Sequence, residues 1–183
     1  AVDRETGVKA RVTCGVLSGV AGLKEAASWP GVDIVVTALV GAAGLIPTLE
    51  ALKCGRRVAL ANKETMVVAG DLIQQMAREF DSHIIPVDSE HSAIYQCLVG
   101  EPLDSIDRLI IRASGGPFLN RSVDTFDKIT RAEALNHPNW KMGMKITIDS
   151  ATMMNKGLEV IEARWLFGID PEEIDVVIHP ESV

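Results

Sequence analysis

Two carboxylates lie one residue apart in the stretch VDSEH, which follows the apolar run HIIP. If Asp88 and Glu90 continue an extended backbone, their side chains project to the same face. Like charges held that close together are unfavourable unless a proton or a cation lies between them. Mg²⁺ and Mn²⁺ prefer oxygen ligands, and open α/β sheets bind ligands at the carboxyl ends of their strands. The pair therefore indicates either a divalent-cation site or a solvated turn or helix cap.

A second polar group lies in IDSATMMNKGLEV. We expect Ser150 to cap the start of a helix, where free backbone N–H groups and the helix dipole favour an anion. Asn155, Lys156 and Glu159 are spaced three or four residues apart, so they can share one edge of that helix. The alternative is an ordinary capped helix with an exposed Lys–Glu pair.

Two loops offer further candidate contacts. Ser114 opens SGGPF, in which two glycines let the backbone approach a ligand closely, although a plain turn has the same composition. NHPNWKMGM places Trp140 in a polar stretch, either as a lid over a pocket or as a staple onto the core. His91 is either a third ligand beside the acidic pair or a cap or packing residue. Because the histidines lack H-x-x-x-H spacing and the cysteines lack a C-x-x-C pair, zinc is not indicated.

These side chains must be positioned by the elements around them, and the first half of the chain alternates between apolar strands and helices. Such alternation is typical of a parallel sheet covered on both faces, which predicts a doubly wound, Rossmann-like α/β part. The expected strands cover 10–19, 33–40, 56–61 and 83–87, and the expected helices cover 20–28, 44–55 and 63–80.

After residue 88 the pattern changes, and we expect a second, α+β unit with a mixed sheet. We place the domain boundary there, giving domains over 1–88 and 89–183. Thr130 and Glu133 match a capping box. One face of the last helix is expected to carry the apolar stripe Met154, Leu158, Ile161 and Trp165. The expected strands cover 106–113 and 145–149, and the expected helices cover 92–98, 130–138 and 150–168.

The amino-acid composition limits the classes of protein to which the chain can belong. With 47% hydrophobic and 23% charged residues, the 183-residue chain reads as an ordinary globular protein. Its net charge of −7 would repel a long nucleic acid, and no stretch approaches the length of a membrane-spanning helix. The number of cysteines is odd, which suits a protein of the reducing cytoplasm; they are Cys14, Cys54 and Cys97. The first residues are charged and lack the apolar segment of a signal peptide.

The dinucleotide fingerprint G-x-G-x-x-G does not occur, although VGAAG at 40–44 and ANKE at 61–64 follow expected strands. The chain also lacks an initiator Met and ends within an apolar run. We therefore expect an internal portion of a longer protein, without the first strand–helix unit of its dinucleotide-binding domain.

Six blocks of sequence together resemble the 1-deoxy-D-xylulose 5-phosphate reductoisomerase family, from about residue 33 to the end. In order along the chain, these blocks are VGAAGLIPTLEA, ALANKE, PVDSEHSAIYQ, ASGGPF, HPNWKMG and DSATMMNKGLEVIEA. The resemblance implies an NADPH-binding Rossmann domain, a catalytic or connecting domain and a C-terminal helical domain. It implies an enzyme that rearranges 1-deoxy-D-xylulose 5-phosphate and reduces the product with NADPH to 2-C-methyl-D-erythritol 4-phosphate, in non-mevalonate isoprenoid synthesis. A homodimer using Mg²⁺, Mn²⁺ or Co²⁺ is expected.

The same resemblance assigns roles to residues. The metal ligands would be Asp88, Glu90 and Glu159, and the catalytic residues Lys63, Glu90 and His137. The substrate would be bound by Ser89, Ser114, His137, Trp140, Ser150, Asn155, Lys156 and Glu159, with the phosphate among Ser114, Ser150, Asn155 and Lys156. The cofactor groove would be lined by Gly41, Ala42, Asn62, Lys63, Glu64 and Met142.

Under this reading residues 1–88 are the second half of the NADPH-binding domain, so the 183 residues alone should bind the cofactor poorly and turn over little. Two alternatives stay open: another NAD(P)-dependent α/β oxidoreductase in which the acidic pair acts as acid and base, and a non-catalytic phosphometabolite-binding or oligomerisation module. The expected location is the bacterial cytoplasm, or the plastid in a plastid-bearing organism.

Overall fold

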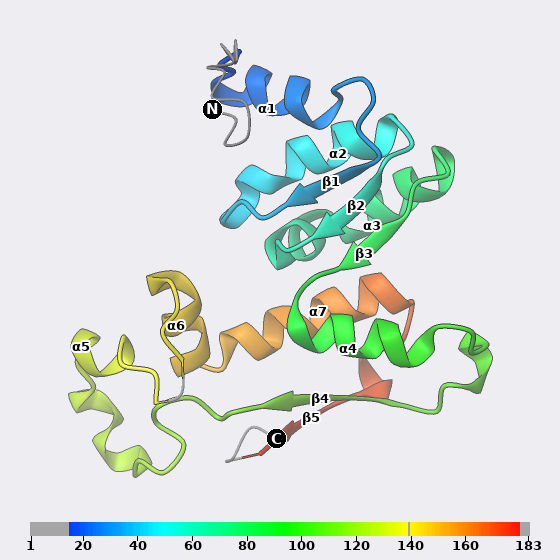
Figure 1. The fold of residues 1–183 in the computed structure, drawn as a ribbon. Helices are drawn as coiled ribbons and strands as arrows, with labels where there is room; N and C mark the ends of the chain where they lie inside the picture. Colours follow the sequence, from blue (N-terminus) through cyan, green and yellow to red (C-terminus); the bar gives the residue numbers. More distant parts are fainter. Residues whose placement is uncertain (1–14, 139, 180–183) are drawn as a thin grey trace, which may run out of the picture.

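The computed structural model of the chain describes residues 15–138 and 140–179. Figure 1 shows two parts, one built on strands β1–β3 with helices α1–α3 and the other on strands β4 and β5 with helices α4–α7. The chain passes from the first part to the second between β3 and α4. None of the helices in the described ranges is both long and apolar enough to cross a membrane.

The first part is a parallel three-stranded sheet in the order β1-β2-β3, with a helix connecting each pair of strands. This confirms the parallel α/β architecture. Side chains on one face of the sheet pack with helix residues such as Leu52 and Met66, whereas Ile34 and Val36 on the other face of β1 are exposed in the structure as described. The strands are Ile34–Thr37, Arg57–Leu60 and Ile84–Pro86, and the helices are α1 Gly19–Ala27, η1 Gly41–Gly44, α2 Leu45–Lys53 and α3 Lys63–Glu79.

Half of the strand expected over 10–19 lies outside the described residues, and its described half, from residue 15, contains no strand. Of the cysteines, Cys54 and Cys97 are free thiols, while Cys14 lies outside the described ranges.

The second part is built on two parallel strands, β4 (Leu109–Ala113) and β5 (Ile174–Ile178). Helix α7 covers them, and its Ala163 and Phe167 pack with Leu109 and Ile111 in a second core. The capping box of Thr130 and Glu133 is present at the start of α5. The helices are α4 Ser89–Leu98, α5 Arg131–Ala134, α6 Met144–Ala151 and α7 Met154–Phe167, with short 3-10 segments η2 Leu103–Ser105, η3 Val123–Lys128 and η4 Pro171–Glu173.

The strand expected over 145–149 is wrong, because this segment lies in helix α6. Polar side chains bond along the helix: the Thr147 hydroxyl donates to the Gly143 carbonyl at 2.9 Å, and Lys145 pairs with Asp149 at 2.6 Å. The described part of this half therefore holds two parallel strands, and the expected mixed sheet is not formed there.

Two helix starts also differ from expectation. Helix α7 begins at Met154, because Met153 adopts a left-handed conformation (φ 61°) that interrupts the helix, and Ser150 consequently lies in the last turn of α6. Helix α4 begins at Ser89, with Asp88 as its N-cap and Glu90 in its first turn. The acidic pair therefore does not continue an extended strand. Carboxylates are favoured in this position because the helix dipole is positive there.

The buried face of α7 is not the expected apolar stripe. Met154 and Ile161 are exposed, whereas Lys156, Glu159 and Glu162 are buried. A helix can bury such groups when partners from other elements offset the cost of removing their charges from water. The face of α7 that carries charge is thus directed at the interior of the molecule.

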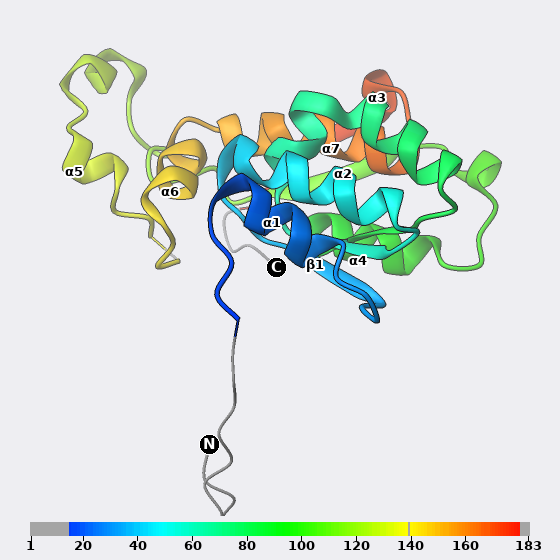
Figure 2. The ribbon, with the colours of Figure 1, turned by 90° about the horizontal axis from the view of Figure 1, so that it is seen from above.

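Helices α3 and α7 connect the two parts, and both ribbon views show them side by side (Figures 1 and 2). Their close approach depends on Gly70, because a Cβ atom there would lie 2.2 Å from the Trp165 ring. Helix α3 departs from helical geometry at Ala69 (φ −145°, ψ 31°), immediately before this contact. The packing brings Lys63, at the start of α3, to the charged face of α7.

Candidate metal and substrate site

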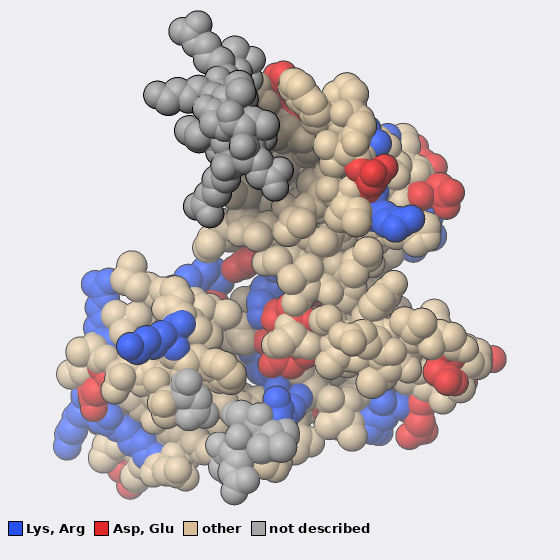
Figure 3. Space-filling model, in the orientation of Figure 1, with Lys and Arg blue, Asp and Glu red and all other residues tan. Residues whose placement is uncertain are grey.

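Figure 3 shows acidic and basic side chains gathered in the hollow between the two parts of the molecule. A pocket of about 410 Å³ lies there, within the size range of small-molecule sites. It brings together twelve of the residues that the sequence singled out: Lys63, Asp88, Ser89, Glu90, Ser114, His137, Trp140, Met142, Ser150, Asn155, Lys156 and Glu159.

Three carboxylates converge at one end of this pocket, and we call Asp88, Glu90 and Glu159 the acidic cage. One oxygen from each lies within 4.8 Å of the others. Asp88 is held as a helix cap, since its Oδ1 accepts a hydrogen bond from the Ser89 backbone N–H at 2.9 Å. Glu159 is only 1% exposed and reaches the cage from α7. The convergence expected from the sequence is therefore present, although two of the three side chains come from a helix start.

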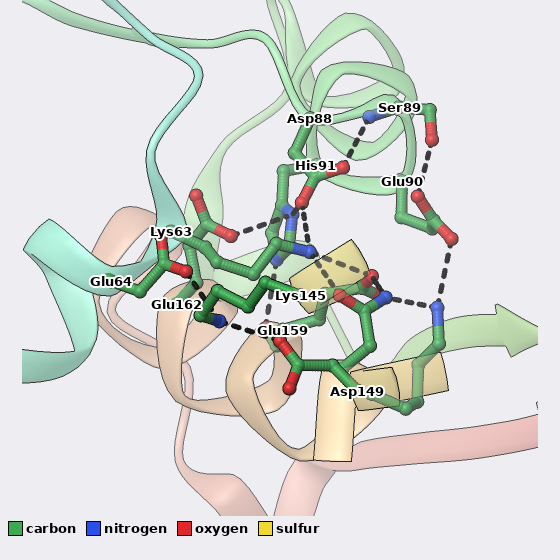
Figure 4. Close-up of polar contacts among 12 residues, drawn as sticks. Lys63, Glu64, Asp88, Ser89, Glu90, His91, Lys145, Asp149, Glu159 and Glu162 are labelled. Atoms are coloured by element: carbon green, nitrogen blue, oxygen red, sulfur yellow. Dashed lines mark hydrogen bonds and ion pairs between the residues drawn. The ribbon is translucent and has the colours of Figure 1, made fainter. Parts of the chain in front are cut away.

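Two ammonium groups occupy the space between the carboxylates (Figure 4). Lys63 Nζ lies 2.6 Å from Asp88 Oδ2 and 3.1 Å from Glu159 Oε1. Lys156 Nζ lies 2.9 Å from Glu90 Oε1 and also pairs with Glu159 Oε2. Asn155 lies in the same network, accepting from Lys63 at 2.8 Å and donating to Glu159. The cage with its two lysines keeps one net negative charge.

These contacts change the acidity of the groups. Burial favours the neutral form of Lys63, but the Glu159 and Asp88 carboxylates outweigh it and raise the pKa of the ammonium. Burial likewise opposes ionisation of Glu90, yet hydrogen bonds from Ser89 and Lys156 lower the pKa of this carboxyl to about 2. Both groups are therefore charged at neutral pH, with Lys63 as a hydrogen-bond donor.

Beneath the cage lie His91 and Glu162, which are both completely buried (Figure 4). His91 Nε2 is 2.8 Å from the backbone carbonyl oxygen of Glu159, and Nδ1 is 3.4 Å from Glu162 Oε2. The imidazole stacks on Phe167 with ring centroids 6.4 Å apart. Burial lowers the pKa of His91, and burial together with the Asp88 charge raises the pKa of Glu162 to about 8. His91 is thus a buried packing residue, in line with one of its two expected roles.

The residues expected to hold a phosphate line the same pocket, and two of them, Asn155 and Lys156, contact the acidic cage. The other two are Ser114 and Ser150. The loop after β4 approaches α6 so closely that a Cβ atom at Gly116 (φ 71°) would lie 2.6 Å from the Ser150 carbonyl oxygen. The helix start expected at Ser150 is wrong, and the helix that carries Asn155 and Lys156 begins instead at Met154.

The loop before α6 supplies His137, Trp140 and Met142 to the rim of the pocket. The Trp140 backbone N–H donates to His137 Nδ1 at 3.1 Å, and burial lowers the pKa of His137. Trp140 is 60% exposed, which argues against its role as a staple onto the core and favours that of a lid. Residue 139, between them, lies outside the described residues.

Comparisons with known proteins agree with the geometry. Residues 3–70 match the family model described as 1-deoxy-D-xylulose 5-phosphate reductoisomerase, and residues 84–167 match that of the C-terminal domain of the same enzyme. The chain is 55% identical over 168 residues to the reductoisomerase of Bacteroides fragilis (92% of this chain, 43% of the relative) and 60% identical over 167 residues to that of Shouchella clausii (91% and 44%). The chain belongs to the 1-deoxy-D-xylulose 5-phosphate reductoisomerase family.

Solved members of this reductoisomerase family share the fold. A crystal structure of DOX-P reductoisomerase in complex with NADPH, fosmidomycin and magnesium superposes with a TM-score of 0.85 at 51% identity, over 91% of this chain and 43% of that one. The Zymomonas mobilis enzyme in complex with NADPH gives 0.82 at 48% identity, over 90% and 42%. The chain therefore spans less than half the length of the reductoisomerases that it matches.

Four of the residues that the family resemblance placed at the cofactor lie outside this pocket: Gly41, Ala42, Asn62 and Glu64. Asn62 is only 1% exposed and acts as the N-cap of α3, its Oδ1 accepting from the Thr65 backbone N–H at 2.8 Å. Its amide donates to the Gly41 carbonyl oxygen at 2.9 Å, which holds the loop before α2. Glu64 pairs with Lys145 at 2.7 Å. The buried Asn62 side chain therefore supports this loop through its hydrogen bonds and does not line the pocket.

Sequence reasoning missed several residues of the candidate site. Arg112, Ile146 and Met153 line the pocket, and Glu162 lies beneath it. Arg112 precedes Ser114 by two residues, so the alternation of a strand could have placed it at the same opening. Glu162 follows Glu159 by three residues, a spacing that puts both on one side of a helix.

Proposed function

We propose that this chain carries the metal- and substrate-binding part of an NADPH-dependent reductoisomerase. The enzyme would rearrange 1-deoxy-D-xylulose 5-phosphate and reduce the product to 2-C-methyl-D-erythritol 4-phosphate, a step of non-mevalonate isoprenoid synthesis. The observation that carries the proposal is the acidic cage, in which carboxylates from two distant segments meet beside two lysines. Family membership supports it independently.

The acidic cage suits a hard divalent cation. Its donors are all carboxylate oxygens close enough to share one ion, and such donors select Mg²⁺, Mn²⁺ or Co²⁺ over softer metals. Asp88, Glu90 and Glu159 would hold this ion. When bound, it acts as a Lewis acid on the ketone and hydroxyl oxygens of the substrate. A relative whose crystal structure contains magnesium supports the same assignment.

The substrate would lie between the cage and the phosphate residues. Lys63 and Ser89 would donate to its oxygens, since the ammonium stays protonated and both residues line the pocket. Ser114, Ser150, Asn155 and Lys156 would hold the phosphate, a set of neutral donors around one cation that suits a dianion. His137 and Trp140 would close over the substrate and exclude water while the reactive intermediate exists.

NADPH would enter from the side of the first part. Lys63 and Met142 line the shared pocket, and the loop of Gly41 and Ala42 lies at the carboxyl end of β1, where α/β sheets bind dinucleotides. Asn62 supports that loop, and Glu64 lies on the first turn of α3. Relatives solved with NADPH support cofactor use.

Several wider features belong to the same proposal. We place the domain boundary near residue 88, with the cofactor half before it and the catalytic or connecting half after it. We also propose a homodimer, and a location in the bacterial cytoplasm or in a plastid.

The test uses the intact enzyme, with this chain joined to the remaining parts that its relatives carry. With Mn²⁺ present it should consume NADPH in response to 1-deoxy-D-xylulose 5-phosphate. Chelation should abolish the reaction and added Mn²⁺ should restore it. Activity that persists under chelation would favour a metal-independent NAD(P) oxidoreductase, and no NADPH consumption under any condition would favour a non-catalytic binding module.

A further inference from the structure

We propose that Arg112 is a further substrate-binding residue, whose guanidinium group holds the phosphate of the substrate and makes the site selective for a phosphorylated sugar. The proposal rests on the proposed function, because it names a second cation for the phosphate of the same substrate. Arg112 is not among the residues that the family resemblance assigns to that phosphate, which are Ser114, Ser150, Asn155 and Lys156.

Strand β4 places Arg112 at the pocket. Buried and exposed residues alternate along this strand: Ile111 and Ala113 are 1% and 5% exposed, whereas Arg112 lies on the other face and is exposed. The strand pairing continues past the end of β4, because the His179 backbone N–H donates to the Ala113 carbonyl oxygen at 2.9 Å. Ser114, two residues after Arg112, therefore comes to the same face, and both residues line the pocket.

The guanidinium group of Arg112 has no ionic partner in the part of the chain that the structure describes. Its neighbour in the register of β5 is Val177, which carries no charge. Arg108, four residues earlier on β4, instead meets Asp175 Oδ2 at 2.7 Å. An unpaired arginine on a surface is usually only solvated. The place of Arg112 in the wall of a pocket, beside a residue expected to bind phosphate, is what makes it a candidate.

The two lysines of the pocket are less available to a phosphate than Arg112 is. Lys63 pairs with the acidic cage at 2.6 Å, and Lys156 pairs with it at 2.9 Å. Each ammonium therefore divides its donors between the cage and any ligand. Within the described lining, Arg112 is the charged donor that is not already paired with a carboxylate. A phosphate dianion in the pocket thus meets an undivided positive charge at Arg112.

The charges of the pocket balance when Arg112 is counted. The acidic cage and its two lysines keep one net negative charge, which a bound divalent cation would convert to one net positive charge. Arg112 raises this to two. His137 also lines the pocket, but burial lowers its pKa and keeps it neutral at neutral pH. Because a phosphate monoester carries about two negative charges at neutral pH, the occupied pocket becomes neutral.

The chemistry of the guanidinium group suits this role. Its planar fork can donate two parallel hydrogen bonds to two oxygens of one phosphate. Ser114 adds a hydroxyl donor beside it: Oγ accepts a hydrogen bond from the Gly116 backbone N–H at 3.3 Å, which leaves the hydroxyl hydrogen for a ligand. A sugar without the phosphate leaves the fork unused, so Arg112 favours the phosphorylated substrate over the free sugar.

The test uses the intact enzyme and two substitutions at Arg112. Arg112→Gln removes the charge and the fork, whereas Arg112→Lys restores the charge alone. Because the side chain is exposed, both variants should keep the fold. Calorimetric titration with inorganic phosphate in Mg²⁺ buffer should give a dissociation constant at least about tenfold higher for the Gln variant and about threefold higher for the Lys variant.

Kinetics supply a second readout. The KM for 1-deoxy-D-xylulose 5-phosphate should rise by the same factors in the two variants, with kcat within about twofold of the parent, because the contact is made equally in the ground state and the transition state. Arg108→Gln is the matched control, since it removes an arginine from the same strand whose partner is Asp175. Its phosphate affinity and its KM should both stay within about twofold of the parent.

Unchanged phosphate affinity in Arg112→Gln would overturn the inference, as would a parent enzyme that binds no phosphate. A rise confined to the KM for NADPH would overturn it too, because the guanidinium would then bind a phosphate of the cofactor. A loss of Mn²⁺ affinity with phosphate binding intact would make Arg112 a partner of the acidic cage instead. The phosphate titration needs no turnover. A parent that binds phosphate through Arg112 and yet consumes no NADPH with the substrate would contradict the proposed function and leave the phosphate site standing.

Discussion

Lys156 provides a prediction of unexpected sign. Its ammonium group pairs with Glu90 and Glu159, two of the three carboxylates proposed to hold the divalent cation. The same oxygens cannot serve an ammonium and a metal ion fully at once. Replacing Lys156 with Met should therefore strengthen divalent-cation binding, although the lysine lies inside the binding site, and should weaken binding of the substrate phosphate.

The size of the effect follows from the Lys156–Glu90 pair. At the observed 2.9 Å, two unit charges interact by about 1.4 kcal/mol even with the dielectric constant of water. The lysine side chain is only 7% exposed, so screening is weaker than in water and this value is a lower bound. Removing the competitor should lower the Mn²⁺ dissociation constant by about tenfold.

Calorimetric titration of the intact enzyme with Mn²⁺ measures the first effect, and the KM for the phosphorylated substrate measures the second, which should rise. Lys145→Met is the matched control, because it removes the same charge from a lysine that pairs with Glu64 and Asp149 outside the cage. Its Mn²⁺ affinity should stay within about twofold of the parent. If Lys156→Met binds Mn²⁺ no more tightly than the parent, the ammonium does not compete for the cage and the reasoning fails.

Three further predictions concern the cage and its supports. Glu159→Gln should weaken Mn²⁺ binding at least about tenfold, or 1.4 kcal/mol, by calorimetry; an unchanged affinity would remove Glu159 from the ligand set. Gly70→Ala should destabilise the protein by about 1–3 kcal/mol in urea unfolding, because the new Cβ would meet the Trp165 ring at 2.2 Å; a parent-like midpoint would mean that α3 and α7 separate freely. The pKa of the Glu162 carboxyl is raised from 4.5 to about 8, so between these pH values the folded protein holds a proton that the unfolded chain releases. The contribution of this group to the free energy of unfolding is therefore complete below pH 4.5 and is lost as the pH rises through 8. Glu162→Gln should flatten this part of the pH profile, and a profile unchanged by the substitution would show that the group titrates normally.

Much of the fold could be predicted from local sequence. Apolar runs separated by helix-period segments were sufficient for the parallel sheet of β1–β3, and the spacing of Thr130 and Glu133 was sufficient for the capping box. These features depend on residues close in the chain or on an apolar run that only a buried strand explains. Most of the pocket residues were also identified, largely through the family resemblance.

Segments with mixed signals were predicted less well. In KITID, Ile146 and Ile148 alternate with polar residues as in a half-buried strand, but the i,i+4 pair of Lys145 and Asp149 fits a helix equally. Periodicity over five residues does not separate the two, and packing of α6 against α7 decides for the helix. Likewise, no local pattern indicates that Met153 adopts the left-handed conformation that separates α6 from α7.

The sequence by itself determined the chemical types available to the site: oxygen ligands at Asp88, Glu90 and Glu159, and the lysines beside them. Only the tertiary structure decided which face of α7 is buried, because that helix carries apolar and charged residues around its whole circumference. Burying Lys156 and Glu159 is tolerable only where opposite charges arrive from α4 and α3. Those partners lie far away along the chain, so the cost and the compensation become visible together only once the helices are packed.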